Sequence, residues 1–179
     1  MLTIGDSKTS RNEWQPGLVA ELNTRAPECF WYYDNKGIAS TTVASWAGII
    51  DATMATVIIE PEVVLLNIGV NDWTPVMPNE ATWKANYQTI IDAIHTKYAN
   101  SRIYIAKVWT SSNDVNAATM AGWIDDLITA NGGVVIEGHN EPVWLDGGDE
   151  GATMTLDGTH YNVAGYTECM NQWLTILGY

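Results

Sequence analysis

Two kinds of pattern alternate along this chain. Short runs rich in apolar residues, typical of buried strands, are separated by longer segments in which apolar residues recur every three or four positions, as on one face of a helix. The run at 63–68 is almost unbroken, which is typical of a central parallel strand covered on both faces. The runs that predict strands are 2–4, 29–33, 63–68, 103–109 and 134–136.

The segments between these runs predict five helices. Trp14, Leu18 and Leu22 share one face of the first helix. Asn79 is the expected N-cap of the third, with Glu80 in its first turn. The apolar face of this third helix is expected to carry Trp83, Tyr87, Ile90, Ile91, Ile94 and Tyr98. The other helices are expected over 43–54, 120–128 and the stretch after His160. The buried face of the last helix is expected to carry Val163, Tyr166, Met170, Trp173, Leu174 and Leu177.

Five strands that alternate with five helices, without a linker or an internal repeat, predict a single α/β domain over residues 1–179. The expected architecture is a three-layer α/β/α arrangement with a mostly parallel sheet and right-handed crossovers. In such sheets, ligands bind beyond the carboxyl ends of the strands. The residues that follow each strand are therefore the candidates for chemistry.

Composition and charge narrow the classes of partner. A domain of 179 residues buries about 70% of the surface that its unfolded chain exposes. The net charge of −13 disfavours phosphate backbones and anionic lipid surfaces, so neither nucleic acid nor a membrane is expected as a partner. No apolar run reaches the ~18 residues of a membrane span. Met1-Leu2-Thr3-Ile4 lacks the basic start of a signal peptide, but an exported mature form stays open.

Cysteines and acidic residues give no sign of a metal. Cys29 and Cys169 are too few for a disulfide framework or a four-cysteine zinc site, and either a pair or two buried thiols is compatible with the sequence. Asp146, Asp149 and Glu150 lack the ligand spacing of a calcium loop. We therefore expect no metal and no cofactor.

Four polar fragments follow predicted strands in chain order. Gly5-Asp6-Ser7 follows the first strand, Gly37 the second and Asn71 the third, and Asp157-Gly158-Thr159-His160 precedes the last helix. Together they supply a nucleophile, a base, a group that orients the base, and oxyanion donors, which are the parts needed for acyl transfer. Asp6 and Asp72 are expected to hold backbone turns.

These fragments resemble the blocks of the SGNH hydrolases, also called GDSL-type esterases, over essentially the whole chain. The resemblance implies a flavodoxin-like strand order and a Ser7-His160-Asp157 triad. It also implies an oxyanion hole made by the backbone N–H groups of Ser7 and Gly37 and the side-chain amide of Asn71, without a cofactor. The chain departs from the family's usual pattern at three positions, which are Lys8, Ala39 and Tyr161.

The natural substrate is less strongly indicated. The family includes sugar acetylesterases, lipases, thioesterases and arylesterases, and the chain shows no long apolar lid. Trp73 and Trp109 follow strands and are candidates for the substrate cleft. We expect short acyl groups, with carbohydrate as a candidate for the alcohol part of the ester. Two alternatives stay open: a flavodoxin-like module that binds phosphate or flavin, and an inactive carbohydrate-binding relative. The sequence does not indicate an oligomeric state.

Overall fold

The strands pair side by side in the order β2-β1-β3-β4-β5, and every neighbouring pair is parallel. The computed structural model describes residues 1–72, 76–109, 114–141 and 153–179. Within those ranges the strands are β1 (Leu2–Gly5), β2 (Asp34–Asn35), β3 (Val63–Asn67), β4 (Arg102–Lys107) and β5 (Val135–Asn140). The flavodoxin-like parallel sheet expected from the sequence is confirmed.

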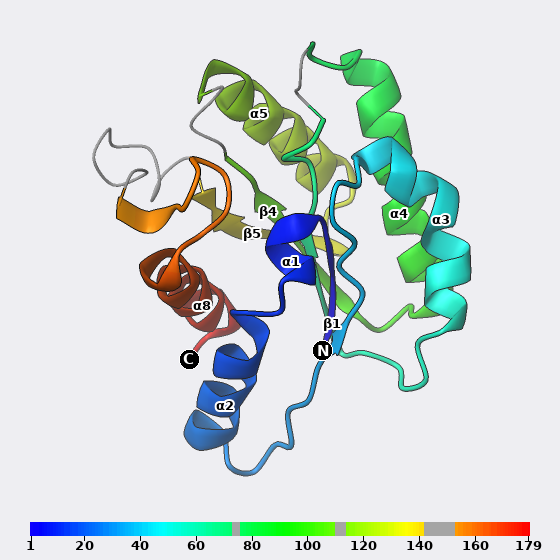
Figure 1. Ribbon diagram of the computed structural model, residues 1–179. Coiled ribbons are helices and arrows are strands. Elements are labelled where there is room, and N and C mark those ends of the chain that lie inside the picture. The colour runs from blue at the N-terminus through cyan, green and yellow to red at the C-terminus, as the bar shows by residue number, and fades with distance from the viewer. Residues whose placement is uncertain (73–75, 110–113, 142–152) are drawn as a thin grey trace.

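The helices form a layer on each face of this sheet (Figure 1). One layer contains α2 and α8, which pack against each other, and the other contains α3, α4 and α5. The three-layer prediction is therefore confirmed. The helices are α1 (Ser7–Ser10), α2 (Gln15–Arg25), α3 (Val43–Ala55), α4 (Glu80–Lys97), α5 (Asp114–Ala130) and α8 (Val163–Leu177).

Side-chain caps fix where three of the long helices begin. The predicted cap Asn79 accepts a hydrogen bond from the Thr82 N–H at 3.1 Å and starts α4. Thr42 caps α3 and Asn162 caps α8 in the same way. Each cap satisfies a backbone donor that has no partner within its own helix. These caps set the points at which the chain turns from the strand-end edge of the sheet into a helix.

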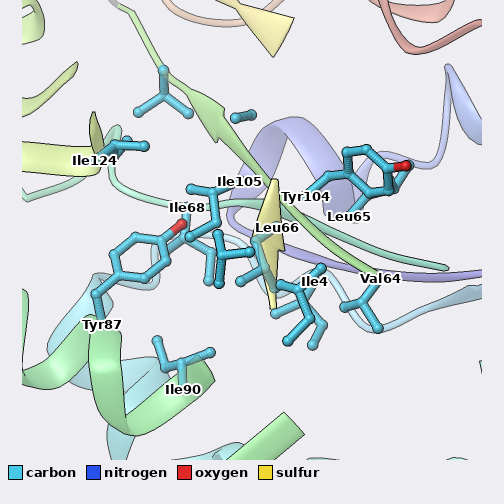
Figure 2. Close-up of a cluster of buried hydrophobic side chains, with 14 of the residues drawn as sticks. Ile4, Val64, Leu65, Leu66, Ile68, Tyr87, Ile90, Tyr104, Ile105 and Ile124 are labelled. Atoms are coloured by element: carbon cyan, nitrogen blue, oxygen red, sulfur yellow. The ribbon is translucent and has the colours of Figure 1, made fainter. Parts of the chain in front are cut away.

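The central strand and the helix stripes form one apolar core. All five residues of β3 are buried, as its unbroken apolar run predicts. Figure 2 shows Tyr87 and Ile90 extending from α4 toward the side chains of β3, with Ile4 of β1 and Ile105 of β4 beside them. The predicted apolar face of α4 is thus buried. None of the helices in the described ranges is both long and apolar enough to cross a membrane.

The second strand lies later in the chain than the sequence predicted. It was expected at 29–33, but β2 is Asp34–Asn35, directly after that run. Leu2 and Thr3 pair with these two residues, and the Asp34 N–H donates to the Met1 carbonyl at 3.0 Å. Hydrogen bonding to β1 sets this register, and an edge strand tolerates polar side chains. The apolar side chain of Phe30 is instead 87% exposed.

The fifth strand and the last helix also differ from the prediction. Strand β5 continues to Asn140, beyond the run at 134–136 that predicted it. His139 therefore lies on this strand, buried, with its ring 4.7 Å from that of Trp173. Val163, expected on the buried face of the last helix, is 82% exposed because it occupies the first position of α8. Tyr166, Trp173 and Leu174 of that face are buried, and Met170 and Leu177 are partly buried against the core.

Candidate active site

The turn after β1 presents Ser7 at the strand-end edge of the sheet. Asp6 is the N-cap of α1, and its Oδ1 accepts the Lys8 N–H at 3.1 Å. Ser7 begins the helix and is partly exposed. A side chain on Gly5 would collide with Thr9 and with a neighbouring backbone carbonyl. Glycine therefore permits α1 to lie tightly against the end of the sheet, and the expected turn-holding role of Asp6 agrees with its contact.

Burial changes the chemistry of Asp6. Its side chain is fully enclosed, and this burial raises the pKa of Asp6 to about 7, although the charge of Lys8 and the hydrogen bond from the Lys8 backbone oppose the rise. The group therefore titrates close to neutrality, whereas a solvated aspartate is ionised well below it.

A second tight loop carries Asp157 and His160. An isolated antiparallel bridge pairs Thr155 with Tyr161, and the Leu156 N–H donates to the His160 carbonyl at 2.7 Å. Inside the loop, Asp157 Oδ1 accepts the Thr159 N–H at 3.1 Å and the His160 N–H at 2.8 Å. This Asx-type turn fixes the imidazole of His160 relative to the carboxylate of Asp157.

The structure brings the three predicted side chains into one hydrogen-bonded series. His160 Nε2 lies 2.8 Å from Ser7 Oγ, and His160 Nδ1 lies 2.7 Å from Asp157 Oδ2. The hydrogen bond from the His160 backbone N–H, together with those from the His160 side chain and the Thr159 N–H, lowers the pKa of Asp157 to about 2, against the opposing effect of burial. Asp157 is consequently a carboxylate at every pH above about 3, as the orienting member of such a series must be.

Asn71 lies in the loop after β3. Its Nδ2 donates to the Thr41 carbonyl at 2.9 Å, and because an amide nitrogen carries two hydrogens, this contact uses only one of them. The neighbouring carboxylate of Asp72 accepts the Val43 N–H at 3.0 and 3.2 Å and so anchors the loop to the start of α3. Burial raises the pKa of Asp72 to about 6, against the hydrogen bond from the Val43 N–H.

Gly37 lies on the other side of the α1 turn. Any side chain at this position would collide with the backbone of Ser10, so the close approach requires glycine. Its N–H donates to Asn35 Oδ1 at 2.8 Å. That backbone donor is therefore already bonded in this structure, and its expected oxyanion role stays a prediction.

The comparison with known families agrees with these fragments. Residues 2–167 match the model of the GDSL-like Lipase/Acylhydrolase family. The chain belongs to this family. No curated protein matches it in sequence. The match spans nearly all of the described fold and supports hydrolase activity at the level of the family.

Solved structures of esterases share the fold of this family member over nearly its whole length. An acetyl xylan esterase, AlAXEase, is 16% identical with a TM-score of 0.80, covering 99% of this chain and 100% of its own. A carbohydrate esterase family 3 protein from Talaromyces cellulolyticus is 18% identical with a TM-score of 0.78, covering 99% and 96%. A mutant acetyl esterase solved with acetate is 16% identical with a TM-score of 0.76, covering 99% and 96%. The TM-scores and the coverage show that this chain shares the fold of these esterases.

The two tryptophans expected at the cleft have different outcomes. Trp73 lies outside the described residues. Trp109 is only 4% exposed, and its backbone N–H and carbonyl are bonded to Glu141 and Lys8. This burial gives no support to the idea that its indole contacts substrate, which stays a prediction.

Cysteines and acidic residues show no metal centre in the described ranges. Cys29 is exposed and Cys169 is buried, and both are free thiols. Within the residues that the structure describes, no three His, Cys, Asp or Glu side chains gather closely enough to hold a metal ion. The acidic positions 146, 149 and 150 lie outside these ranges.

Sequence reasoning did not single out Glu141, which is fully buried directly after β5. It forms an ion pair with Lys8, with 2.5 Å between Glu141 Oε2 and Lys8 Nζ. One signal pointed to it. Lys8 occupies a position that is usually apolar in the family, and a buried ammonium requires an anionic partner. The sequence did not show which of the 21 acidic residues would supply it.

Proposed function

We propose that this chain is a serine esterase that hydrolyses short-chain acyl esters, with acetyl groups on carbohydrate as the favoured substrate class. The observation that carries the proposal is the hydrogen-bonded series from Ser7 Oγ through the imidazole of His160 to Asp157. A serine hydroxyl is a weak nucleophile until an adjacent base can take its proton, and this arrangement supplies that base.

The proposed reaction begins as Ser7 Oγ attacks the ester carbonyl and His160 Nε2 takes the hydroxyl proton. Asp157 holds the imidazole in the tautomer with hydrogen on Nδ1 and stabilises the imidazolium that forms. Collapse of the tetrahedral intermediate breaks the ester C–O bond, and His160 gives its proton to the departing alcohol. Water then attacks the acyl-serine with His160 again as base, which releases the acid and restores Ser7.

The oxyanion is proposed to be met by the Ser7 N–H, the Asn71 amide and the Gly37 N–H. The last donor would have to share its hydrogen with Asn35 Oδ1 or leave it. A backbone N–H later in the same loop, which joins β2 to α3, is the alternative donor. That loop contains Ser40, with a φ of 63°, and Thr41, whose carbonyl contacts Asn71. Two or three donors pointed at a developing negative charge stabilise the transition state more than the substrate.

The acyl preference rests on weaker support than the reaction type. Three structures of the same fold are described as an acetyl esterase, an acetyl xylan esterase and a carbohydrate esterase. Among the described residues, Trp14, Trp46, Trp83, Trp109, Trp123 and Trp173 are buried, so the richness of the chain in tryptophan adds no support for a sugar-binding surface. The activities named for the three structures favour a small acyl group on a sugar.

Hydrolysis of p-nitrophenyl acetate by the wild type and by Ser7→Ala tests the reaction. The variant loses the nucleophile and keeps only binding and oxyanion contacts, so kcat is expected to fall by roughly 10⁴–10⁶ with the fold intact. Near-normal hydrolysis by Ser7→Ala would remove Ser7 from the mechanism.

Two other outcomes would support the alternative functions. A folded wild type that binds glycans but hydrolyses no ester would support the inactive carbohydrate-binding relative. A flavin in the purified protein would support the flavodoxin-like module.

A further inference from the structure

The buried carboxylate of Glu141 joins two positions that directly follow proposed triad residues. Its Oε2 accepts Lys8 Nζ at 2.5 Å, and Lys8 follows Ser7 in the chain. Its Oε1 accepts the hydroxyl of Tyr161, which follows His160. These partners lie 133 and 20 residues from Glu141 in sequence. One side chain therefore connects the α1 turn to the loop that carries the imidazole.

Further contacts make this arrangement more than a single ion pair. Glu141 Oε2 also accepts the Trp109 N–H at 2.8 Å, and Lys8 Nζ donates to the Trp109 carbonyl at 2.7 Å. The same ammonium lies 4.8 Å from the centroid of the Tyr161 ring, within the range of a cation–π contact. The side chains of Lys8 and Glu141 are fully buried. We call Lys8, Trp109, Glu141 and Tyr161 the Glu141 network.

Stability alone is a poor explanation for this network. Removing two charges from water is costly, and replacing a buried ion pair with apolar residues of similar volume is often neutral or stabilising. The charged network therefore needs a reason specific to this site, and defining one geometry is a documented use of buried polar groups.

The geometry that needs defining is the separation of Ser7 and His160. Hydrogen bonds inside the 155–161 loop fix His160 relative to Asp157. These hydrogen bonds do not determine the position of the loop relative to α1, the helix that begins with Ser7. The Glu141 network connects these two segments next to the reacting atoms. A displacement of about 1 Å between catalytic groups can cost around 100-fold in rate.

We propose that Glu141, through Lys8 and Tyr161, is a positioning residue that sets the distance between Ser7 Oγ and His160 Nε2. It does not touch substrate and exchanges no proton with it. The proposal rests on the esterase function proposed above. It implies that loosening the network lowers kcat and the reactivity of Ser7 while leaving ester binding almost unchanged.

Tyr161→Phe is the sharpest variant, because it removes one hydroxyl and leaves the Lys8–Glu141 ion pair in place. Tyr98→Phe is its matched control. Tyr98 is also buried, it ends α4 at the opposite edge of the sheet, and in the described part of the chain its hydroxyl has no hydrogen-bond partner. A double variant, Lys8→Met with Glu141→Gln, breaks the connection to α1 without leaving a buried charge unpaired.

The measurements are kcat and KM on p-nitrophenyl acetate, the rate of labelling by a serine-directed fluorophosphonate, and a thermal melt. We expect Tyr161→Phe and the double variant each to lower kcat and the labelling rate roughly tenfold or more, with KM within about twofold, because the displaced groups act in the chemical step. Tyr98→Phe is expected to match the wild type in both rates.

The network has no positioning role if either variant folds and keeps kcat within about twofold of the wild type, or if KM alone rises. Loss of thermal stability with unchanged kcat has the same meaning. If one variant does not fold, the other decides. An inactive, unlabelled wild type would remove the esterase function itself, whereas an active wild type with unaffected variants removes only the proposal about Glu141.

Discussion

His160 Nε2 lies 2.8 Å from Ser7 Oγ, although 153 residues separate the two in the chain. The contact forms because β1 and the segment before α8 end at the same edge of the sheet. Parallel pairing brings the carboxyl ends of all five strands to that edge. The predictions below follow from this contact and from the groups packed around it.

Asp157→Asn is expected to lower kcat by about 10⁴ with a small change in KM. The amide oxygen can still accept the Thr159 and His160 backbone N–H groups, so the loop should persist. An amide NH₂ facing Nδ1 would favour the wrong imidazole tautomer. Steady-state kinetics on p-nitrophenyl acetate, with a circular dichroism check of the fold, measures this. A loss below about tenfold would mean that Asp157 does not orient the base.

Asn71→Ala is expected to lower kcat by about 10²–10³ with KM nearly unchanged, because the lost amide acts on the developing oxyanion. The variant also loses the contact with the Thr41 carbonyl. Asn71→Asp is a useful companion, since its carboxylate would face the oxyanion and should be at least as damaging. If only KM rises in Asn71→Ala, the side chain binds substrate and the oxyanion assignment fails.

Asp6→Asn is expected to flatten the dependence of stability on pH. The pKa of buried Asp6 is raised to about 7, while an unfolded aspartate titrates near pH 3.9. Between these values the native state keeps a proton that the unfolded state has released, so a rise in pH favours unfolding by about 1.4 kcal/mol per pH unit. Asparagine removes this slope and can still cap α1.

Urea unfolding of both proteins at pH 5 and pH 7 measures the effect. The free energy of unfolding of Asp6→Asn minus that of the wild type should be about 2 to 3 kcal/mol larger at pH 7 than at pH 5, because only the wild type loses stability over this range. Other groups titrate equally in the two proteins, so the difference isolates Asp6. An equal change in both proteins would show that native Asp6 is already ionised at pH 5.

Acyl chain length is expected to be limited. Each buried methylene contributes about 0.8 kcal/mol, so a deep acyl groove would raise kcat/KM several-fold per carbon. We expect good turnover of p-nitrophenyl acetate and butyrate, and a fall in kcat/KM of at least about tenfold by decanoate, or roughly 1.4 kcal/mol of transition-state binding. A series from two to ten carbons below micelle-forming concentrations measures this. A constant still rising at eight to ten carbons would indicate a lipase-like groove.

Much of the fold followed from periodicity. The apolar run of β3 and the stripe of α4 are buried as predicted, because burial of one face is what the spacing encodes. Strand β2 could not be read in this way, since two polar edge residues are paired only by hydrogen bonds to β1. Val163 was misplaced because spacing shows which face is apolar, and not where a helix begins.

Part of the candidate site could also be predicted from the sequence. Short fragments at strand ends pointed to Ser7, Asn71 and His160, because the chemistry needs those side chains at that edge. The sequence did not show that the Gly37 N–H is bonded to Asn35. It also did not show that Glu141 is the partner of Lys8, because long-range pairing depends on how the loops pack.

In the proposed reaction, Ser7 is a nucleophile activated by His160. Treatment with a fluorophosphonate probe, followed by peptide mapping in a mass spectrometer, tests this role, with Ser7→Ala as the control. We expect one adduct on Ser7 that forms in the wild type and is absent from the variant. An unlabelled, folded wild type, or an adduct on another residue that persists in Ser7→Ala, would contradict it.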